Sequence, residues 1–186
     1  INSPTVHALV YGAVLFLSYF LFPWVLNRTP FLLRWDEAVY LFIHKQILLT
    51  GFIPETLRYI DTIPNYIYPT LYMLMSALQL FPSPQTFDLR LASLALQTVL
   101  FFSLLISSLM ISRLTKIFFN NEKTAFLAGL LFLALPIVSY RLFYLHATFY
   151  ANFVGITFLL CSLFLLLRAK TTGKKHFLLL SAFFYG

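Results

Sequence analysis

The chain has 186 residues, of which 60% are apolar and only 10% carry a formal charge, and its net charge is +7. Soluble domains have roughly 45–50% apolar and about 25% charged residues. Together with a mean hydropathy of +0.84, this composition indicates a protein that lies in a lipid bilayer. It excludes soluble enzymes, nucleic-acid-binding proteins and disordered tails.

Several apolar stretches are long enough to cross a hydrocarbon core of about 30 Å, which takes around 20 helical residues. They cover residues 6–26, 91–112, 125–143 and 148–167, and a further one begins at 177. The first could instead be a signal peptide, but it lacks a preceding basic region and a following Ala-x-Ala site. The sequence therefore predicts an all-α, polytopic bundle of transmembrane helices, and we expect it to be a fragment of a larger membrane protein.

Residues 27–90, between the first two spans, hold five of the six acidic residues. Within them, residues 66–81 are uncharged and flanked by prolines, and as a helix they would be about 24 Å long. This is short for a span and suits a helix that lies at the membrane interface. We therefore predict an extended outside loop over 27–90 that carries interfacial helices. The alternative is that 66–81 crosses the membrane.

The positive-inside rule constrains these alternatives, because Lys and Arg gather in cytoplasmic loops. Two connectors are basic, the first with Arg113, Lys116 and Lys123, the second with Arg168, Lys170, Lys174 and Lys175. If 66–81 does not cross, the N-terminus is cytoplasmic and loop 27–90 lies outside. If it crosses, the N-terminus is outside and the loop is cytoplasmic. Charge alone does not separate the two topologies, and the shortness and prolines of 66–81 favour the first.

The polar loop contains candidates for chemistry. Asp36, Tyr40 and His44 are spaced at i, i+4 and i+8, so they share one face of an amphipathic helix that we predict to start near Asp36. Adjacent Glu37 would lie about 100° around the helix from Asp36, so we expect it to have different partners. The simplest interpretation is a charged helix start on a membrane surface. The functional one is that a poorly hydrated carboxylate acquires a raised pKa and acts as a general base.

Lys45, Arg58 and Arg90 are the notable cations of this loop. They either extend to lipid headgroups or recognise a phosphate, for which Arg is geometrically suited. His146, in the predicted turn between the third and fourth spans, is the single weak candidate for a metal ligand. A lone His at a helix end is more often a hydrogen-bonded interfacial residue. The sequence has no cluster with metal-ligand spacing, no Gly-rich phosphate loop and no nucleophile motif.

The order of these features resembles the N-terminal part of glycosyltransferase superfamily C (GT-C). These integral membrane enzymes include protein O-mannosyltransferases and aminoarabinose transferases. The resemblance rests on one span, a loop opening with Asp36-Glu37, the segments Tyr68-Pro69-Thr70-Leu71-Tyr72 and Leu89-Arg90-Leu91-Ala92-Ser93, a basic turn over 113–123, and Leu135-Pro136 in the next helix. It covers nearly the whole chain.

The resemblance implies transfer of a sugar from a polyprenyl-phosphate-linked donor, with inversion, on the outside (periplasmic or lumenal) face of a plasma, inner or endoplasmic reticulum membrane. Asp36 would be the general base, and Glu37 would orient the acceptor or a divalent cation, a cofactor that the resemblance leaves open. The leaving phosphate and the rest of the substrate would contact Lys45, Arg58, Arg90, Tyr40, His44, Tyr68 and Tyr72. The fragment alone would be inactive.

Two other functions remain open. Relatives commonly carry an acid in the second outside loop, whereas residues 140–152 contain none, which is what a non-catalytic membrane subunit of the same architecture would show. A transporter is the other alternative, although transporters usually place charged or helix-breaking residues at mid-membrane depth. The spans here are uncharged except for Arg141, which we place near a helix end.

Overall fold

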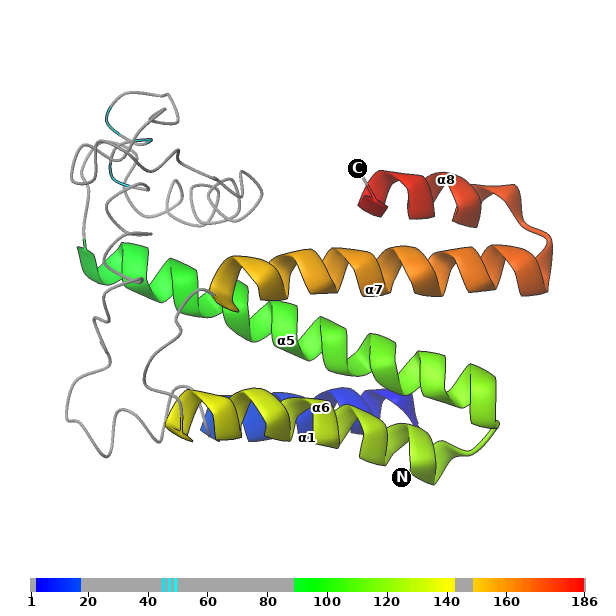
Figure 1. The fold of residues 1–186 in the computed structure, drawn as a ribbon, viewed down its shortest axis with the longest axis horizontal. Helices are drawn as coiled ribbons and strands as arrows, with labels where there is room; N and C mark the ends of the chain where they lie inside the picture. Colours follow the sequence, from blue (N-terminus) through cyan, green and yellow to red (C-terminus); the bar gives the residue numbers. More distant parts are fainter. Residues whose placement is uncertain are drawn as a thin grey trace.

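The computed structural model describes residues 3–17, 45, 47, 49, 89–142 and 149–185 of the chain. Regular structure in these residues is helical, without a strand, which confirms the all-α class for this part of the chain. The helices are α1 (Pro4–Phe16), α5 (Leu89–Phe119), α6 (Glu122–Leu142), α7 (Phe149–Thr172) and α8 (Lys175–Tyr185) (Figure 1). Most of the segment 27–90, with its predicted interfacial helices, lies outside the described residues.

Local sequence explains where α1 begins. Ser3 occupies the N-cap, and its Oγ accepts a hydrogen bond from the backbone N–H of Thr5 at 3.3 Å. Pro4 follows in the first turn, where a helix needs no backbone donor. The start of the helix is thus marked by a Ser-Pro pair ahead of the apolar run.

The turn between α5 and α6 consists of Asn120 and Asn121 only. Asn120 has a φ of 48°, a left-handed conformation that Asn tolerates better than most residues. The Oδ1 of Asn121 accepts hydrogen bonds from the backbone N–H groups of Lys123 at 2.9 Å and Thr124 at 3.2 Å, which caps α6. Helix α5 therefore continues to Phe119, past the end of the predicted span at residue 112.

The turn between α7 and α8 is equally short. Gly173 has a φ of 69°, and its N–H donates to the carbonyl of Ala169 at 2.9 Å, the usual way in which a glycine ends a helix. Helix α7 thus extends to Thr172, beyond the predicted limit of 167. Both basic connectors of the sequence are largely the ends of helices rather than loops.

Helix α5 lies in the middle of the bundle. It packs against α6 and α1 on one side and against α7 on the other, and α8 packs on the outer side of α7 (Figure 1). The α5–α6 turn and the α7–α8 turn lie at the same end of the molecule. We call this the basic end; it carries Arg113, Lys116, Lys123, Arg168, Lys170, Lys174 and Lys175.

The contacts of α1 establish its direction. His7 lies against Ser112 near the end of α5, whereas Leu15 packs with Leu104, two turns earlier in α5. Helix α1 is therefore antiparallel to α5 and leads the chain away from the basic end, while α5 leads it back. The buried core at this junction consists of Tyr11, Leu15, Leu104 and Leu133, each at most 1% exposed.

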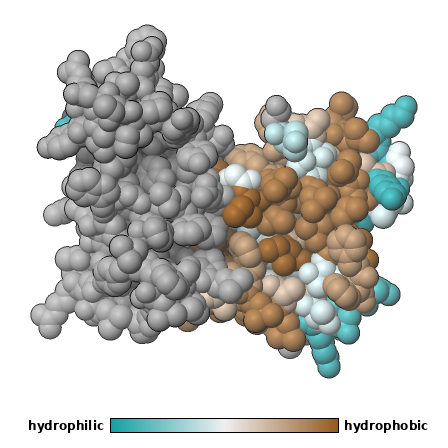
Figure 2. Space-filling view, viewed as in Figure 1, coloured by the Kyte–Doolittle hydropathy of each residue, from teal (hydrophilic) through white to brown (hydrophobic). Residues whose placement is uncertain are grey.

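Much of the remaining surface is apolar. Leu131 is 66% exposed, Leu179 is 74% exposed and Phe183 is 77% exposed. Figure 2 shows this apolar surface over the described helices, with hydrophilic side chains gathered at the basic end. Two helical segments of the described residues, Phe101–Phe119 and Val154–Thr172, are long and apolar enough to cross a membrane. These features indicate contact with a lipid bilayer.

Candidate functional site

Most residues of the predicted site lie outside the described part of the chain. This applies to both proposed catalytic acids, Asp36 and Glu37, and to Tyr40, His44, Arg58, Tyr68, Tyr72 and His146. Lys45 and Arg90 are described. The roles of all these residues therefore stay predictions.

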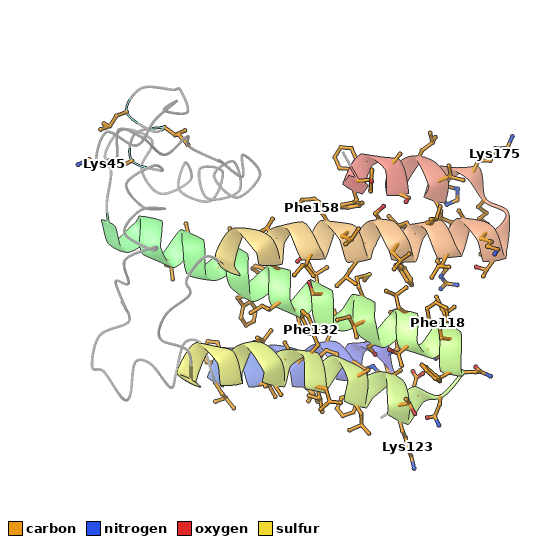
Figure 3. All side chains as sticks on the ribbon, viewed as in Figure 1. Lys45, Phe118, Lys123, Phe132, Phe158 and Lys175 are labelled. Carbon is orange, nitrogen blue, oxygen red and sulfur yellow. The ribbon has the colours of Figure 1, made fainter. Side chains whose placement is uncertain are left out.

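Lys45 and Arg90 lie at the same end of the molecule. Arg90 is in the first turn of α5, and α5 starts at the end opposite the basic end. Lys45 is an exposed helical residue, and Figure 3 places it at this end as well, far from Lys123 and Lys175. Lys45 and the helix turn that contains Arg90 are thus at the same end of the bundle, although they are 45 residues apart in sequence. They are two of the three cations predicted to bind phosphate.

The junction of α1, α5 and α6 holds the first group of buried polar side chains. The Nδ1 of His7, a residue only 4% exposed, lies 3.2 Å from the Oγ of Ser112 in α5. One turn on, the hydroxyl of Tyr11 donates to the backbone carbonyl of Phe126 in α6 at 2.9 Å. The His7 ring also contacts Phe126, with the ring centroids 5.0 Å apart. These contacts attach α1 to both of its neighbours.

Gly129 makes the fit of Tyr11 possible. A Cβ atom at this position would overlap the phenol ring of Tyr11. The ring is fully buried and stacks on Phe126 with 5.6 Å between the centroids, so it has no free space to move into. The absence of a side chain at Gly129 is therefore a packing requirement of the α1–α6 contact.

The contact between α5 and α7 is made by small hydroxyl side chains. The Oγ1 of Thr157 in α7 donates to the backbone carbonyl of Ser103 at 3.0 Å, and it lies 2.9 Å from the Oγ of Ser107. Ser107 is fully buried. Small residues let two helix backbones approach closely, and interhelical hydrogen bonds stabilise such contacts in lipid.

A reciprocal pair of serines joins α7 to α8. The Oγ of Ser181 donates to the carbonyl of Ser162 at 2.9 Å, and the Oγ of Ser162 lies 3.0 Å from the carbonyl of Ser181. Both side chains are buried. The pair satisfies polar groups that would otherwise be costly in an apolar environment.

Sequence reasoning missed these hydroxyl contacts. The available signal was the recurrence of Ser103, Ser107, Ser108 and Ser112 in an otherwise apolar stretch, at helical spacing. All four are buried in the structure. Ser107 contacts Thr157 of α7 and Ser112 contacts His7 of α1, whereas the Ser108 hydroxyl bonds to Leu104 in its own helix. In the described residues, no group of three His, Cys, Asp or Glu side chains could hold a metal ion.

An ion pair fixes the α5–α6 turn at the basic end. The Nζ of Lys116 in α5 lies 2.7 Å from the Oε2 of Glu122 at the start of α6. This hydrogen bond with the Lys116 ammonium holds the pKa of Glu122 below its usual range, and the nearby charge of Arg113 acts in the same direction. Among the residues that the structure describes, Glu122 is the one acid.

The α7–α8 turn has a different electrostatic character. The Arg168 guanidinium lies over the Phe164 ring, 5.7 Å from its centroid. Lys170, Lys174 and Lys175 are exposed, and none of them forms an ion pair with a described residue. This turn therefore concentrates positive charge that the described helices leave uncompensated.

Comparisons with protein-family models, with curated proteins and with solved structures give no match for this chain.

Proposed function

We propose that the chain lies in a membrane as a multi-pass protein with the basic end in the cytoplasm. Seven described Lys and Arg residues lie at this end, against Lys45, Arg90 and Arg141 among the described residues elsewhere. Cytoplasmic connections carry such an excess. The exposed apolar side chains of the helices then face lipid.

The direction of α1 bears on the two topologies that charge alone left open. Because α1 leads away from the basic end and α5 leads back to it, the chain between them leaves and returns on the side opposite the cytoplasm. A single crossing by residues 66–81 would instead make α1 run parallel to α5, so the observed antiparallel direction supports a segment that does not cross once. It favours the topology in which Asp36 and Glu37 face the outside.

On this topology we propose that the protein is a glycosyltransferase that uses a polyprenyl-phosphate-linked sugar. The observation that carries the proposal is that Lys45 and the first turn of α5, which contains Arg90, lie at the end opposite the basic end. This is the face on which lipid-linked sugars are used, and cations there suit a phosphate leaving group. The resemblance of the sequence to GT-C enzymes supports the same assignment.

The proposed chemistry assigns one task to each group. The Asp36 carboxylate takes the proton from the acceptor hydroxyl or amine as the acceptor atom bonds to the anomeric carbon. The bond from that carbon to the phosphate oxygen breaks on the opposite face, so the configuration inverts. The electron pair stays on the lipid phosphate, where Lys45, Arg58 and Arg90 stabilise the growing negative charge. Glu37 orients the acceptor or a cation.

Topology is the first test. In full-length protein with Cys161→Ser, a cysteine at Leu49, which is 61% exposed, is compared with one at Asn121 in the α5–α6 turn. A membrane-impermeant maleimide applied to intact cells should label Leu49→Cys only. Asn121→Cys should react only after the membrane is opened. Labelling of Asn121→Cys in intact cells would reverse the topology and remove the basis for outside transfer.

Transfer is the second test. Asp36→Asn in the full-length protein should lower transfer from a polyprenyl-phosphate sugar by about 10²–10⁴-fold, the range for loss of a general base. Asp61→Asn removes an acid from the same loop and is the matched control, which should keep wild-type transfer. Wild-type transfer by Asp36→Asn would disprove the base assignment. If the wild-type protein inserts into the membrane but transfers no sugar, the result would favour a non-catalytic subunit.

A further inference from the structure

The two turns of the basic end differ in how much of their positive charge is compensated by a nearby acid. In the α5–α6 turn, Lys116 is engaged by Glu122 at 2.7 Å, so part of the positive charge is already compensated. In the α7–α8 turn, no acidic residue is present between residues 168 and 176. Lys170, Lys174 and Lys175 extend from a turn whose backbone is held by Gly173. The α7–α8 turn therefore has more uncompensated positive charge than the α5–α6 turn.

One lysine of each turn can be compared in direction. Figure 3 shows Lys175 and Lys123 extending away from one another, on opposite sides of the basic end. The hydroxyls of Thr171 and Thr172 are both bonded to the carbonyl of Arg168, at 3.2 Å and 2.7 Å. The ammonium groups of Lys170, Lys174 and Lys175 form no ion pair with the residues that the structure describes.

Exposed apolar side chains lie next to these lysines. Leu166 in α7 is 48% exposed, and Leu178 and Leu179 in the first turns of α8 are 55% and 74% exposed. A soluble anion makes no apolar contacts with neighbouring leucines, whereas a phospholipid has acyl chains directly below its phosphate. The combination of free ammonium groups and adjacent exposed leucines matches that order of groups along the membrane normal.

We propose that the α7–α8 turn is a binding site for the phosphate of an anionic phospholipid in the cytoplasmic leaflet. Lys170, Lys174 and Lys175 contact the headgroup, and Leu166, Leu178 and Leu179 contact its acyl chains. Each lysine near an anionic surface raises affinity about fivefold, so the three together contribute on the order of a hundredfold. The proposal rests on the membrane insertion proposed above and is independent of sugar transfer.

The test measures lipid binding by the full-length protein. Purified protein is titrated with phosphatidylglycerol or phosphatidylcholine in detergent, and retained lipid is counted by native mass spectrometry. Phosphatidylglycerol should be retained preferentially, and inorganic phosphate should not displace it at equal concentration. The variant K170Q/K174Q/K175Q should lose most of this preference, and the charge-keeping variant K170R/K174R/K175R should retain it.

The matched control removes the same number of charges from the other turn. The variant R113Q/K116Q/K123Q should retain phosphatidylglycerol as the wild-type protein does. Equal loss in both Gln variants would show a diffuse charge effect and overturn the assignment to one turn. Unchanged retention in K170Q/K174Q/K175Q, or retention of both lipids alike by wild type, would overturn the proposal outright. Because the readout is lipid counting, a protein that binds lipid but transfers no sugar would contradict the transferase proposal alone.

Discussion

The two sides of α5 are joined to their neighbours by different kinds of contact. On one side, α1 and α6 meet α5 through large side chains, with Tyr11, Leu15, Leu104 and Leu133 fully buried together. On the other side, α7 meets α5 through Ser103, Ser107 and Thr157. Lipid is as apolar as a leucine side chain, so shape and hydrogen bonds rather than water exclusion must hold both contacts. The first side depends mainly on shape and the second on hydroxyl pairing.

Gly129→Leu should produce the largest loss of stability. Any side chain at 129 overlaps the buried Tyr11 ring, and the ring cannot withdraw without breaking its hydrogen bond to the Phe126 carbonyl. We expect the free energy of unfolding of the full-length protein in detergent to fall by about 3 kcal/mol. Gly12→Leu is the control, because a Cβ atom at Gly12 has no neighbour within 4 Å. Equal effects of the two changes would refute the shape argument.

Leu104→Ala should have the next largest effect. Leu104 is 1% exposed and packs with Tyr11, Leu15 and Leu133, so truncation leaves a cavity between three helices. Moving an apolar side chain from protein to lipid costs little free energy, so the loss comes mainly from the missing packing contacts. We expect the free energy of unfolding to fall by about 2 kcal/mol. Leu131→Ala, at a position 66% exposed, should change the unfolding free energy little. Thermal unfolding of both variants in one detergent measures the difference.

The different contacts on the two sides of α5 were only partly predictable from the sequence. The long apolar stretches indicated helices in the right places, because spans of about 20 residues have few other structures available in lipid. The helices continue past the predicted span ends at residues 112 and 167, because charged side chains such as Arg113 and Arg168 can stay within a helix while their heads reach water. Which face of a helix meets protein was not predictable, because lipid-facing and protein-facing apolar residues look alike.

The candidate site was predictable to a different degree. The scarcity of acids made Asp36 and Glu37 stand out, and these assignments stay predictions because both residues lie outside the described part. The position of Lys45 relative to Arg90 needed the fold, since it depends on the direction in which α1 and α5 run. The buried pairing of Ser162 with Ser181 was likewise not predictable, because it depends on how α7 and α8 are aligned against each other. The spacing of residues within one helix gives no information about that alignment.

Thr157→Val should test the hydroxyl side of α5 at nearly constant volume. The change removes the donor to the Ser103 carbonyl and the partner of Ser107, while the branched shape is kept. Interhelical hydrogen bonds in membrane proteins are worth about 0.6 kcal/mol on average and about 1.7 at most, so we expect a loss of about 1 kcal/mol. Thr98→Val is the control, because among the described residues its hydroxyl bonds to Leu94 in its own helix and to no other helix. A loss as large as that of Leu104→Ala would erase the distinction between the two sides.

The smallest expected effect concerns pH at the turn that connects α5 to α6. The hydrogen bond with Lys116 lowers the pKa of Glu122 in the folded protein, so the ionised carboxylate favours folding at neutral pH. This contribution is present above the unfolded pKa of about 4.3 and is lost as the pH falls through the lower folded value. The thermal midpoint of wild-type protein should therefore exceed that of Glu122→Gln at pH 7, and the gap should begin to narrow as the pH falls below about 4.3 and disappear only below the lowered folded pKa. The gap should also narrow in high salt, because the Lys116 side chain is 43% exposed to solvent and its charge is screened there. A gap that persists unchanged in acid would mean that Glu122 acts through the shape of the turn, which Asn120 and Asn121 already determine, rather than through its charge.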